Sequence, residues 1–201
     1  DTFQFIQQFG RSEGAGGAER LDFFMDNSAS GRMKVELKNA AGQLRKQYRW
    51  GGVFTIGSWL QVLITWDGTT LQGFFDGVFQ APSIQVDLSH TVVREDRITG
   101  TGRIDPTSGF RWDGRMHSIA LWDADISAAA ATIFNGGAGR SFDLQKNQGA
   151  YTFAGNLLPW WRFGFDPSSI GRDFGSGPIL IDANASGTGN MSASDIVTDA
   201  P

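Results

Sequence analysis

Alternation of apolar and polar residues dominates the first half of the chain. In residues 33–38, MKVELK, three apolar side chains alternate with three charged ones. This is the pattern of a strand with one face in the core and the other in water, so we expect Glu36 to be a solvated surface charge. Residues 3–9 and 21–26 alternate in the same way. Residues 59–66, WLQVLITW, are apolar on both faces, which predicts a central strand covered by a second layer.

Turn signals separate these segments. Asp67-Gly68 and Asp76-Gly77 follow apolar runs, and Asp-Gly is favoured where a tight hairpin needs a positive φ. Several short strands punctuated by glycine and aspartate predict an all-β, antiparallel sandwich. One short helix is predicted near residues 127–134, where Ser127 could cap a run of four alanines and a pair of glycines could end it.

The composition changes after residue 140. Residues 149–165 contain a cluster of aromatic side chains, and from residue 168 the chain is rich in glycine, serine, asparagine and aspartate. Polar, glycine-rich stretches bury too little apolar area to fold alone. We therefore expect a β-sandwich over residues 1–140. Over residues 141–201 we expect an aromatic connector and an extended C-terminal arm, ordered where it contacts something.

Charge and composition exclude several classes of function. The chain has 201 residues, a formal net charge of -4 and no cysteine. An acidic chain lacks the basic face that nucleic-acid binding needs. Without cysteine there is no disulfide framework, thiol nucleophile or zinc–thiolate site. No apolar run approaches the roughly 20 residues that span a membrane. We therefore expect neither a nucleic acid nor a membrane as a partner.

Catalytic patterns fail on spacing or context, so we predict that the chain is not an enzyme. Glycoside hydrolysis needs two carboxyl groups facing each other, but the four glutamates show no E-x-D-x-E strand pattern. Residues 10–14 match G-x-S-x-G, yet that nucleophile motif requires a helix after it, and here a strand pattern follows. His90 and His117 lack the spacing of zinc ligands. No phosphate-binding loop is present, and no cofactor is required.

A calcium site remains open. Calcium prefers carboxylate and carbonyl oxygens, which loops rich in aspartate and glycine supply. The candidate ligands are Asp67, Asp76 and Asp105. The favoured alternative for the first two is a purely structural role in hairpin turns.

A sugar site remains open as well, because aromatic faces stack on sugar rings. The candidate platforms lie near Arg or Asp residues and near predicted strand ends; they are Trp50, Trp112, Trp160 and Trp161. The favoured alternative is that these rings pack in the core, as aromatic side chains generally do.

Two segments resemble a known family. Residues 59–78, WLQVLITWDGTTLQGFFDGV, resemble the hairpin of LamG-like jelly-roll domains, which belong to the concanavalin A-like lectin and glucanase superfamily. Residues 101–137 resemble the closing strand and short helix of the same family. The resemblance implies a two-sheet antiparallel β-sandwich with one short helix after the closing strand. The family commonly has an acidic pair where this chain has His117-Ser118, so a role of those acids is not carried over. Family domains also begin with strands upstream of the segment matched by residues 3–9, and we expect these to be missing here or supplied by other residues.

The C-terminal region carries a second resemblance. Residues 157–167, LLPWWRFGFDP, and residues 189–201, GNMSASDIVTDAP, are similar to segments that follow LamG-like domains in structural proteins of marine bacteriophages. This implies a non-catalytic virion protein, such as a capsid-decorating, fibre or tail component. Its partners would be other virion proteins or copies of itself, with cell-surface glycans as ligands. A secreted bacterial carbohydrate-binding module and a glycoside hydrolase of the same fold are the alternatives.

Overall fold

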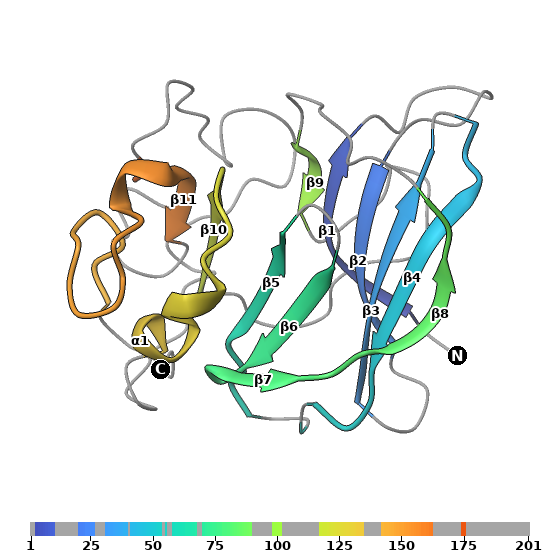
Figure 1. The fold of residues 1–201 in the computed structure, drawn as a ribbon, viewed down its shortest axis with the longest axis horizontal. Helices are drawn as coiled ribbons and strands as arrows, with labels where there is room; N and C mark the ends of the chain where they lie inside the picture. The colour runs from blue at the N-terminus through green and yellow to red at the C-terminus, as the bar shows by residue number, and fades with distance from the viewer. Residues whose placement is uncertain are drawn as a thin grey trace, which may run out of the picture. The chain divides into compact units, whose positions relative to one another are not determined.

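The described part of the chain is all-β, with three antiparallel sheets and one short α-helix (Figure 1). The computed structural model describes residues 21–25, 31–39, 41–53, 55, 58–67, 70–89, 117–134, 142–162 and 174–175 with their side chains, and residues 3–10, 20, 26 and 98–101 by backbone alone. The fold class expected from the alternation is therefore confirmed at the level of antiparallel β-structure.

The chain divides into two compact units, and it passes between them several times. Unit 1 comprises Asp1–Ser58, Trp66–Gly73 and Gln80–Gly114. Unit 2 comprises Trp59–Thr65, Phe74–Phe79 and Arg115–Pro201. A three-stranded sheet has residues in both units; its strands are β5 (Val62–Trp66), β6 (Leu71–Phe75) and β7 (Val78–Gln80).

Unit 1 contains a six-stranded sheet with the order β8-β4-β3-β2-β1-β9. Its strands are β1 (Phe3–Gly10), β2 (Arg20–Asp26), β3 (Arg32–Lys38), β4 (Leu44–Trp50), β8 (Ser83–Asp87) and β9 (Ile98–Thr101). β2 and β3 pair without interruption, which places Phe23 opposite Val35 and Asp22 opposite Glu36. The uninterrupted register keeps one face apolar along both strands and gathers their charged side chains on the other.

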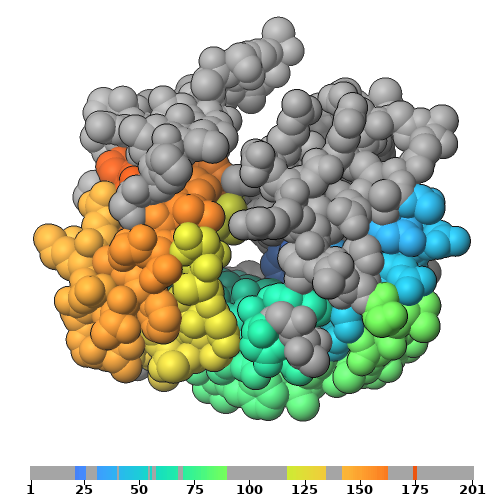
Figure 2. All heavy atoms as spheres, turned by 45° about the horizontal axis from the view of Figure 1, so that its top comes forward, coloured from blue at the N-terminus to red at the C-terminus, as the bar shows by residue number. Residues whose placement is uncertain are grey.

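The edge strand β8 carries an irregularity in its pairing. Gln47 pairs with Val86 and Tyr48 with Ile84, so Gln85 has no partner of its own on β4. An extra residue of this kind twists an edge strand and hinders its pairing with another chain. β8 forms part of the molecular surface, coloured green in Figure 2, and Ile84 is 54% exposed.

One face of the six-stranded sheet is a core of apolar and aromatic side chains. Its most buried members are Met33, Val35, Leu37, Tyr48 and Trp50, none more than 3% exposed. The alternation of residues 33–38 thus predicted the apolar face correctly. Trp50 anchors this face, because its indole Nε1 donates a hydrogen bond of 2.9 Å to the carbonyl oxygen of Gln80.

The opposite face of the sheet is buried too, and the expectation of a solvated Glu36 is wrong. Asp22 is 1% exposed, and Phe24, Glu36 and Gln47 are each 8% exposed. Period-2 alternation identifies which face is apolar, but it contains no information about whether the polar face is also covered. The charged residues of β2 and β3 must therefore find partners within the protein.

Unit 2 contains a two-stranded sheet and short helical turns. β10 (Ser118–Trp122) pairs with β11 (Leu157–Arg162), so that Ser118 lies opposite Arg162. The helical turns are η1 (Ser127–Ala129), α1 (Ala130–Ile133) and η3 (Ala154–Asn156). None of the helices in the described residues is long and apolar enough to cross a membrane.

The helix expected near residues 127–134 is present as η1 followed directly by α1. Ser127 does not cap it, because the capping position of η1 is Ile126, which makes no side-chain capping bond. Instead, Asp125 Oδ1 accepts a hydrogen bond of 2.9 Å from the backbone N–H of Ser127. The sequence therefore predicted the turn, but its start is fixed by a carboxylate two residues upstream.

Residues 142–162 form an integral part of the core of unit 2. The buried cluster of this unit comprises Leu63, Phe74, Ile126, Ala129, Ala130, Ile133, Leu144, Tyr151, Leu157 and Trp160. Four of these ten residues come from the segment 142–162. Tyr151 is fully buried, and its hydroxyl donates a hydrogen bond of 2.8 Å to the carbonyl oxygen of Leu144. The segment expected to be an aromatic connector supplies a large share of this core.

The contact between Gly73 and Trp50 generates a test of the packing in unit 1. A Cβ at position 73 would lie 2.6 Å from Cε2 of the Trp50 indole, which is 1% exposed. We expect Gly73→Ala to lower the free energy of unfolding by about 2 kcal/mol, as overpacking does. Urea denaturation measures the change.

Gly51→Ala is the matched control for this substitution, because nothing lies within 4 Å of a Cβ at that position. In a Trp50→Phe background, Gly73→Ala should lower the free energy of unfolding by less than it does in the wild type, because the smaller ring leaves space for the added Cβ. An equal loss of stability for both glycine substitutions would contradict the steric explanation.

Candidate functional site

The tryptophans predicted as sugar platforms are buried where the structure describes them. Trp50 in unit 1 is 1% exposed, and Trp160 and Trp161 in unit 2 are 4% and 3% exposed. A sugar ring stacks only on an accessible ring face, and none of the three rings offers one. Trp50, Trp160 and Trp161 are therefore core residues in this structure. Trp112 lies outside the described residues.

The aspartates predicted as calcium ligands make local hydrogen bonds in their loops. Asp67 Oδ1 accepts a bond of 2.6 Å from the backbone N–H of Thr70. Asp76 has a φ of 51°, and its Oδ1 accepts a bond of 2.9 Å from the backbone N–H of Gln61. Among the described residues, no three acidic or histidine side chains gather in a way that could hold a metal ion. These bonds are those expected of turn residues, and Asp105 lies outside the described residues.

The polar face of the six-stranded sheet carries a network that we call the charged layer: Asp22, Lys34, Glu36, Lys38 and Gln47. Lys38 Nζ lies 3.4 Å from Asp22 Oδ2 and 3.2 Å from Glu36 Oε2, so it bridges the two carboxylates. Lys34 Nζ lies 2.9 Å from Glu36 Oε1. Gln47 Nε2 donates a hydrogen bond of 2.7 Å to the same oxygen. Each carboxylate of the layer thus has a cation beside it.

The electrostatics of the charged layer hold Glu36 in its ionised form. Burial acts to raise the pKa of Glu36, but hydrogen bonding to Lys34 and the charges of Lys34 and Lys38 outweigh it, so the pKa lies below its ordinary value. A general acid of a glycosidase needs the opposite shift, towards a protonated carboxyl at neutral pH. The ion pairs of the layer neutralise its buried carboxylates. Because its pKa is lowered, Glu36 is ionised and has no proton to donate at neutral pH.

A second ion pair lies where β4 meets the edge strand β8. Lys46 Nζ pairs with Asp87, and it also lies 5.4 Å from the centre of the Trp66 ring. The hydrogen bond to Asp87 raises the pKa of Lys46, although burial opposes the shift. Lys46 therefore stays charged, and it holds the edge strand to its neighbour.

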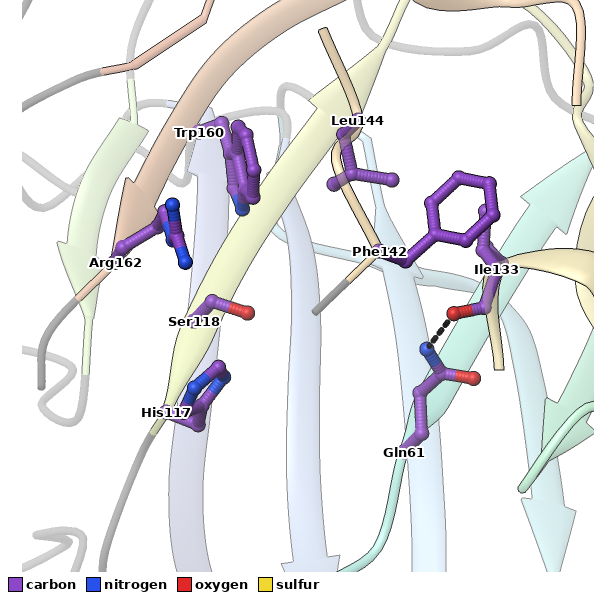
Figure 3. Close-up of a pocket in the computed structure, with 8 residues that line it drawn as sticks. All are labelled: Gln61, His117, Ser118, Ile133, Phe142, Leu144, Trp160 and Arg162. Atoms are coloured by element: carbon purple, nitrogen blue, oxygen red, sulfur yellow. Dashed lines mark hydrogen bonds between the residues drawn. The ribbon is translucent and has the colours of Figure 1, made fainter. Parts of the chain in front are cut away.

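Unit 2 contains a small cavity, shown in Figure 3. Its described lining residues are Gln61, His117, Ser118, Ile133, Phe142, Leu144, Trp160 and Arg162. The cavity has a volume of about 60 Å³. Sites that enclose a whole drug-sized ligand are several-fold larger, on the order of 300 Å³ or more. The cavity therefore has room for a few waters or for one small polar group.

The polar groups of the cavity come from three segments. β10 and its preceding residue supply Ser118 and His117, β11 supplies Arg162, and Gln61 precedes β5 (Figure 3). Gln61 is held in place because its Nε2 donates a hydrogen bond of 3.3 Å to the carbonyl oxygen of Ile133. The guanidinium carbon of Arg162 lies 4.9 Å from the centre of the Trp160 ring, which orients the cation by cation–π contact.

Burial and charge together keep the His117 ring neutral at pH 7. Burial lowers the pKa of His117 below its ordinary value of 6.5, and the positive charge of Arg162 lowers it further. Burial also lowers the pKa of Arg162, but a guanidinium keeps its charge at any physiological pH. The cavity therefore combines one permanent cation with one imidazole whose pKa lies below its ordinary value.

The sequence did not reveal these residues as a group. His117 and Arg162 are 45 positions apart in the chain, and the antiparallel register of β10 and β11 brings them together.

Comparison of the chain with protein families, with curated proteins and with solved structures gives no match. Assignment of a function therefore depends on the residues and their geometry.

The charged layer gives a test of its structural role. We expect Lys38→Met to lower the free energy of unfolding at neutral pH by about 2 kcal/mol, because it removes a cation from between two buried carboxylates. The depressed pKa of Glu36 stabilises the fold above about pH 4.5, and this contribution is lost as the pH falls through the folded-state pKa. The difference between variant and wild type should therefore shrink in acid, as measured by urea denaturation over a pH series.

Lys146→Met is the control for this substitution. Lys146 pairs with Asp143 at 3.0 Å, but its side chain is 77% exposed. We expect a change within about 0.5 kcal/mol, as for other surface pairs. A Lys38→Met variant as stable as the control at neutral pH would contradict the structural role of the charged layer.

Proposed function

We propose that this chain is a non-catalytic LamG-like module of a virus particle, with a two-sheet jelly roll. In this role it assembles with other particle proteins or with copies of itself. The observation that carries the jelly-roll part of the proposal is the order of elements in the two segments that resemble the family, and the particle role rests on the resemblance of residues 157–167 and 189–201 to segments of bacteriophage structural proteins. A hairpin precedes a closing strand, and a short helix follows that strand.

The first of these segments, residues 59–78, contains β5, β6 and the start of β7. The turn between β6 and β7 is the expected Asp76-Gly77 pair, and both residues have a positive φ. A Cβ at position 77 would lie 3.0 Å from Cα of Ala131, so the turn requires glycine for both conformation and space. The hairpin of the proposed jelly roll is supported by these features.

The second segment, residues 101–137, contains β10 and then η1 and α1. The buried residues Ile126, Ala129 and Ile133 pack this turn into the core of unit 2. A helix of four residues is too short to form alone, so its place depends on this packing. A short helix seated directly after a strand is the arrangement that the resemblance implies.

The proposal that the chain is non-catalytic rests on the ion pairing of two buried carboxylates. Asp22 and Glu36 lie directly opposite each other on β2 and β3. Lys38 bridges them, and the pKa of Glu36 is lowered. A retaining or inverting glycosidase needs one protonated carboxyl and one carboxylate, which this arrangement opposes.

Association with particles is the direct test of the proposed role. We expect an antibody raised against the purified chain to label intact virus particles from the source of the sequence, as seen by immunogold electron microscopy. Particles that lack the chain, with the label confined to secreted material, would instead support a bacterial carbohydrate-binding module.

Hydrolysis assays test the proposal that the chain is non-catalytic. We expect the wild-type chain to release no reducing ends from common neutral and acidic polysaccharides. The Asp22→Asn and Glu36→Gln variants are the controls, because turnover that either variant abolishes while it remains folded would establish a glycoside hydrolase and refute this part of the proposal.

A further inference from the structure

The edge strand β8 contributes less to the core of unit 1 than β4, the strand with which it pairs. Four of the five residues of β8 are exposed, and the fifth, Val86, is half-buried. Four of the seven residues of β4 are buried. Tyr48 and Ile84 pair with each other, yet Tyr48 is 2% exposed and Ile84 is 54% exposed. Burial of apolar surface is the main term that holds an element in place, so β8 opens at a lower cost than β4.

Polar contacts, rather than apolar burial, hold β8 to β4. The N–H of Leu88 donates a hydrogen bond of 2.8 Å to the carbonyl oxygen of Arg45. Lys46 Nζ pairs with Asp87, and the side chain of Lys46 is only 9% exposed. A strand that replaced β8 without an acidic side chain at this position would bury Lys46 without a carboxylate, which is costly. Any strand on this edge of β4 must therefore place an acidic side chain beside Lys46.

The outer edge of β8 is a poor place for a further strand to add. Gln85 has no partner of its own on β4, and an irregularity of this kind twists an edge strand. The edge of β4 is covered by β8, which pairs with it from Lys46 to Arg49. A chain that associates through this side of the sheet must therefore replace β8 on β4.

We infer that β8 is an exchangeable strand, and that β4 accepts the β8 of a second copy of this chain in its place. Charge complementarity identifies this partner, because the β8 of the second copy brings Asp87 into register with Lys46. Exchange in both directions gives a two-fold symmetric dimer in which each copy regains the contacts between β4 and β8. The edge of β4 thus fits the second copy as well as it fits the chain's own strand.

The segments on either side of β8 supply the hinge and the reach for this exchange. Before β8, only Ala81 and Pro82 connect it to β7, and short hinges promote the exchange of an element between copies. After β8, the ten residues 88–97 precede β9. Ten extended residues span up to about 33 Å. β8 can therefore leave β4 while β9 stays paired with β1.

The ion pair between Lys46 and Asp87 controls the rate of exchange. The monomer and the exchanged dimer contain the same contacts between β4 and β8, so the pair stabilises both. Exchange passes through a state in which β8 is open, and that state lacks the pair. The ion pair therefore slows the exchange.

Strand exchange gives the proposed assembly with copies of the chain a specific contact, and its role in a particle rests on the proposed function. The exchange itself is a property of the purified chain. Crosslinking of purified chains and labelling of particles therefore succeed or fail independently.

Cysteine crosslinking tests the exchange, since the chain has no cysteine of its own. Arg49 on β4 pairs with Ser83 on β8, and paired residues of antiparallel strands are close enough for a disulfide. An Arg49→Cys variant that carries an affinity tag is mixed at high concentration with an untagged Ser83→Cys variant and then oxidised. We expect a covalent heterodimer, because each thiol finds its pairing partner only on the other copy.

A mixture of Arg49→Cys with Gln85→Cys is the matched control. Gln85 and Ser83 are both exposed residues of β8, but Gln85 has no partner on β4. We expect roughly tenfold less heterodimer from the control mixture, because a disulfide requires the two Cβ atoms to lie within about 4.5 Å of each other. Equal yields from the two mixtures, or no heterodimer in either, would overturn the inference.

Substitution of Asp87 tests the ion pair as the control of the rate. Adding Asp87→Asn to both crosslinking variants should make the heterodimer form about tenfold faster, because opening β8 no longer breaks a charged hydrogen bond. Asp143→Asn in both variants is the control, since Asp143 pairs with Lys146 in unit 2. An unchanged rate with Asp87→Asn would contradict this role of the ion pair.

Hydrogen exchange of the wild-type chain decides the question if a cysteine variant fails to fold. We expect the backbone amides of β8 to exchange at least about tenfold faster than those of β3, because β8 opens separately from the sheet. Equal protection of the two strands would overturn the inference, since β8 could then leave β4 only when the whole sheet unfolds.

Discussion

Burial of polar side chains on one face of β2, β3 and β4, opposite an apolar core on the other face, is the constraint on which unit 1 depends. A strand with water on one side can leave its charged side chains solvated, but a strand covered on both sides cannot. The apolar face meets this constraint through packing around Trp50, whose indole lies against Gly73. The polar face meets it through ion pairs, with Lys38 bridging Asp22 and Glu36. The uninterrupted register of β2 and β3 serves both faces at once, because a slip of one residue would exchange them.

The parts of the fold that the sequence predicted are those that depend on local periodicity. Residues 33–38 indicated a strand, and their three apolar side chains are buried as expected. The same pattern could not predict that Glu36 is 8% exposed, because the burial of a second face depends on residues distant in sequence. Asp76-Gly77 was predicted as a turn because both residues have a chemical reason to adopt positive φ, which is again a local property.

The candidate site was harder to predict for the same reason. Trp160 and Trp161 stand beside Arg162 in the sequence, and this neighbourhood suggested an exposed platform for sugars. Their burial follows from the pairing of β11 with β10, where Trp161 lies opposite Ile119 and Trp160 opposite Ala120. β11 itself was not predicted, since Pro159 interrupts its pattern and proline is tolerated in a strand only at an edge or a bulge. Arg162 emerged as a cavity residue only once that register was known.

Charge balance explains why the charged layer holds the fold and does not serve as a binding site. In the charged layer, each carboxylate lies within ion-pair distance of a lysine, and Gln47 donates a further hydrogen bond. The buried carboxylates therefore have their partners within the layer. An additional ion there would have to displace a buried ion pair, and the cost of leaving a buried charge unpaired would exceed the attraction gained.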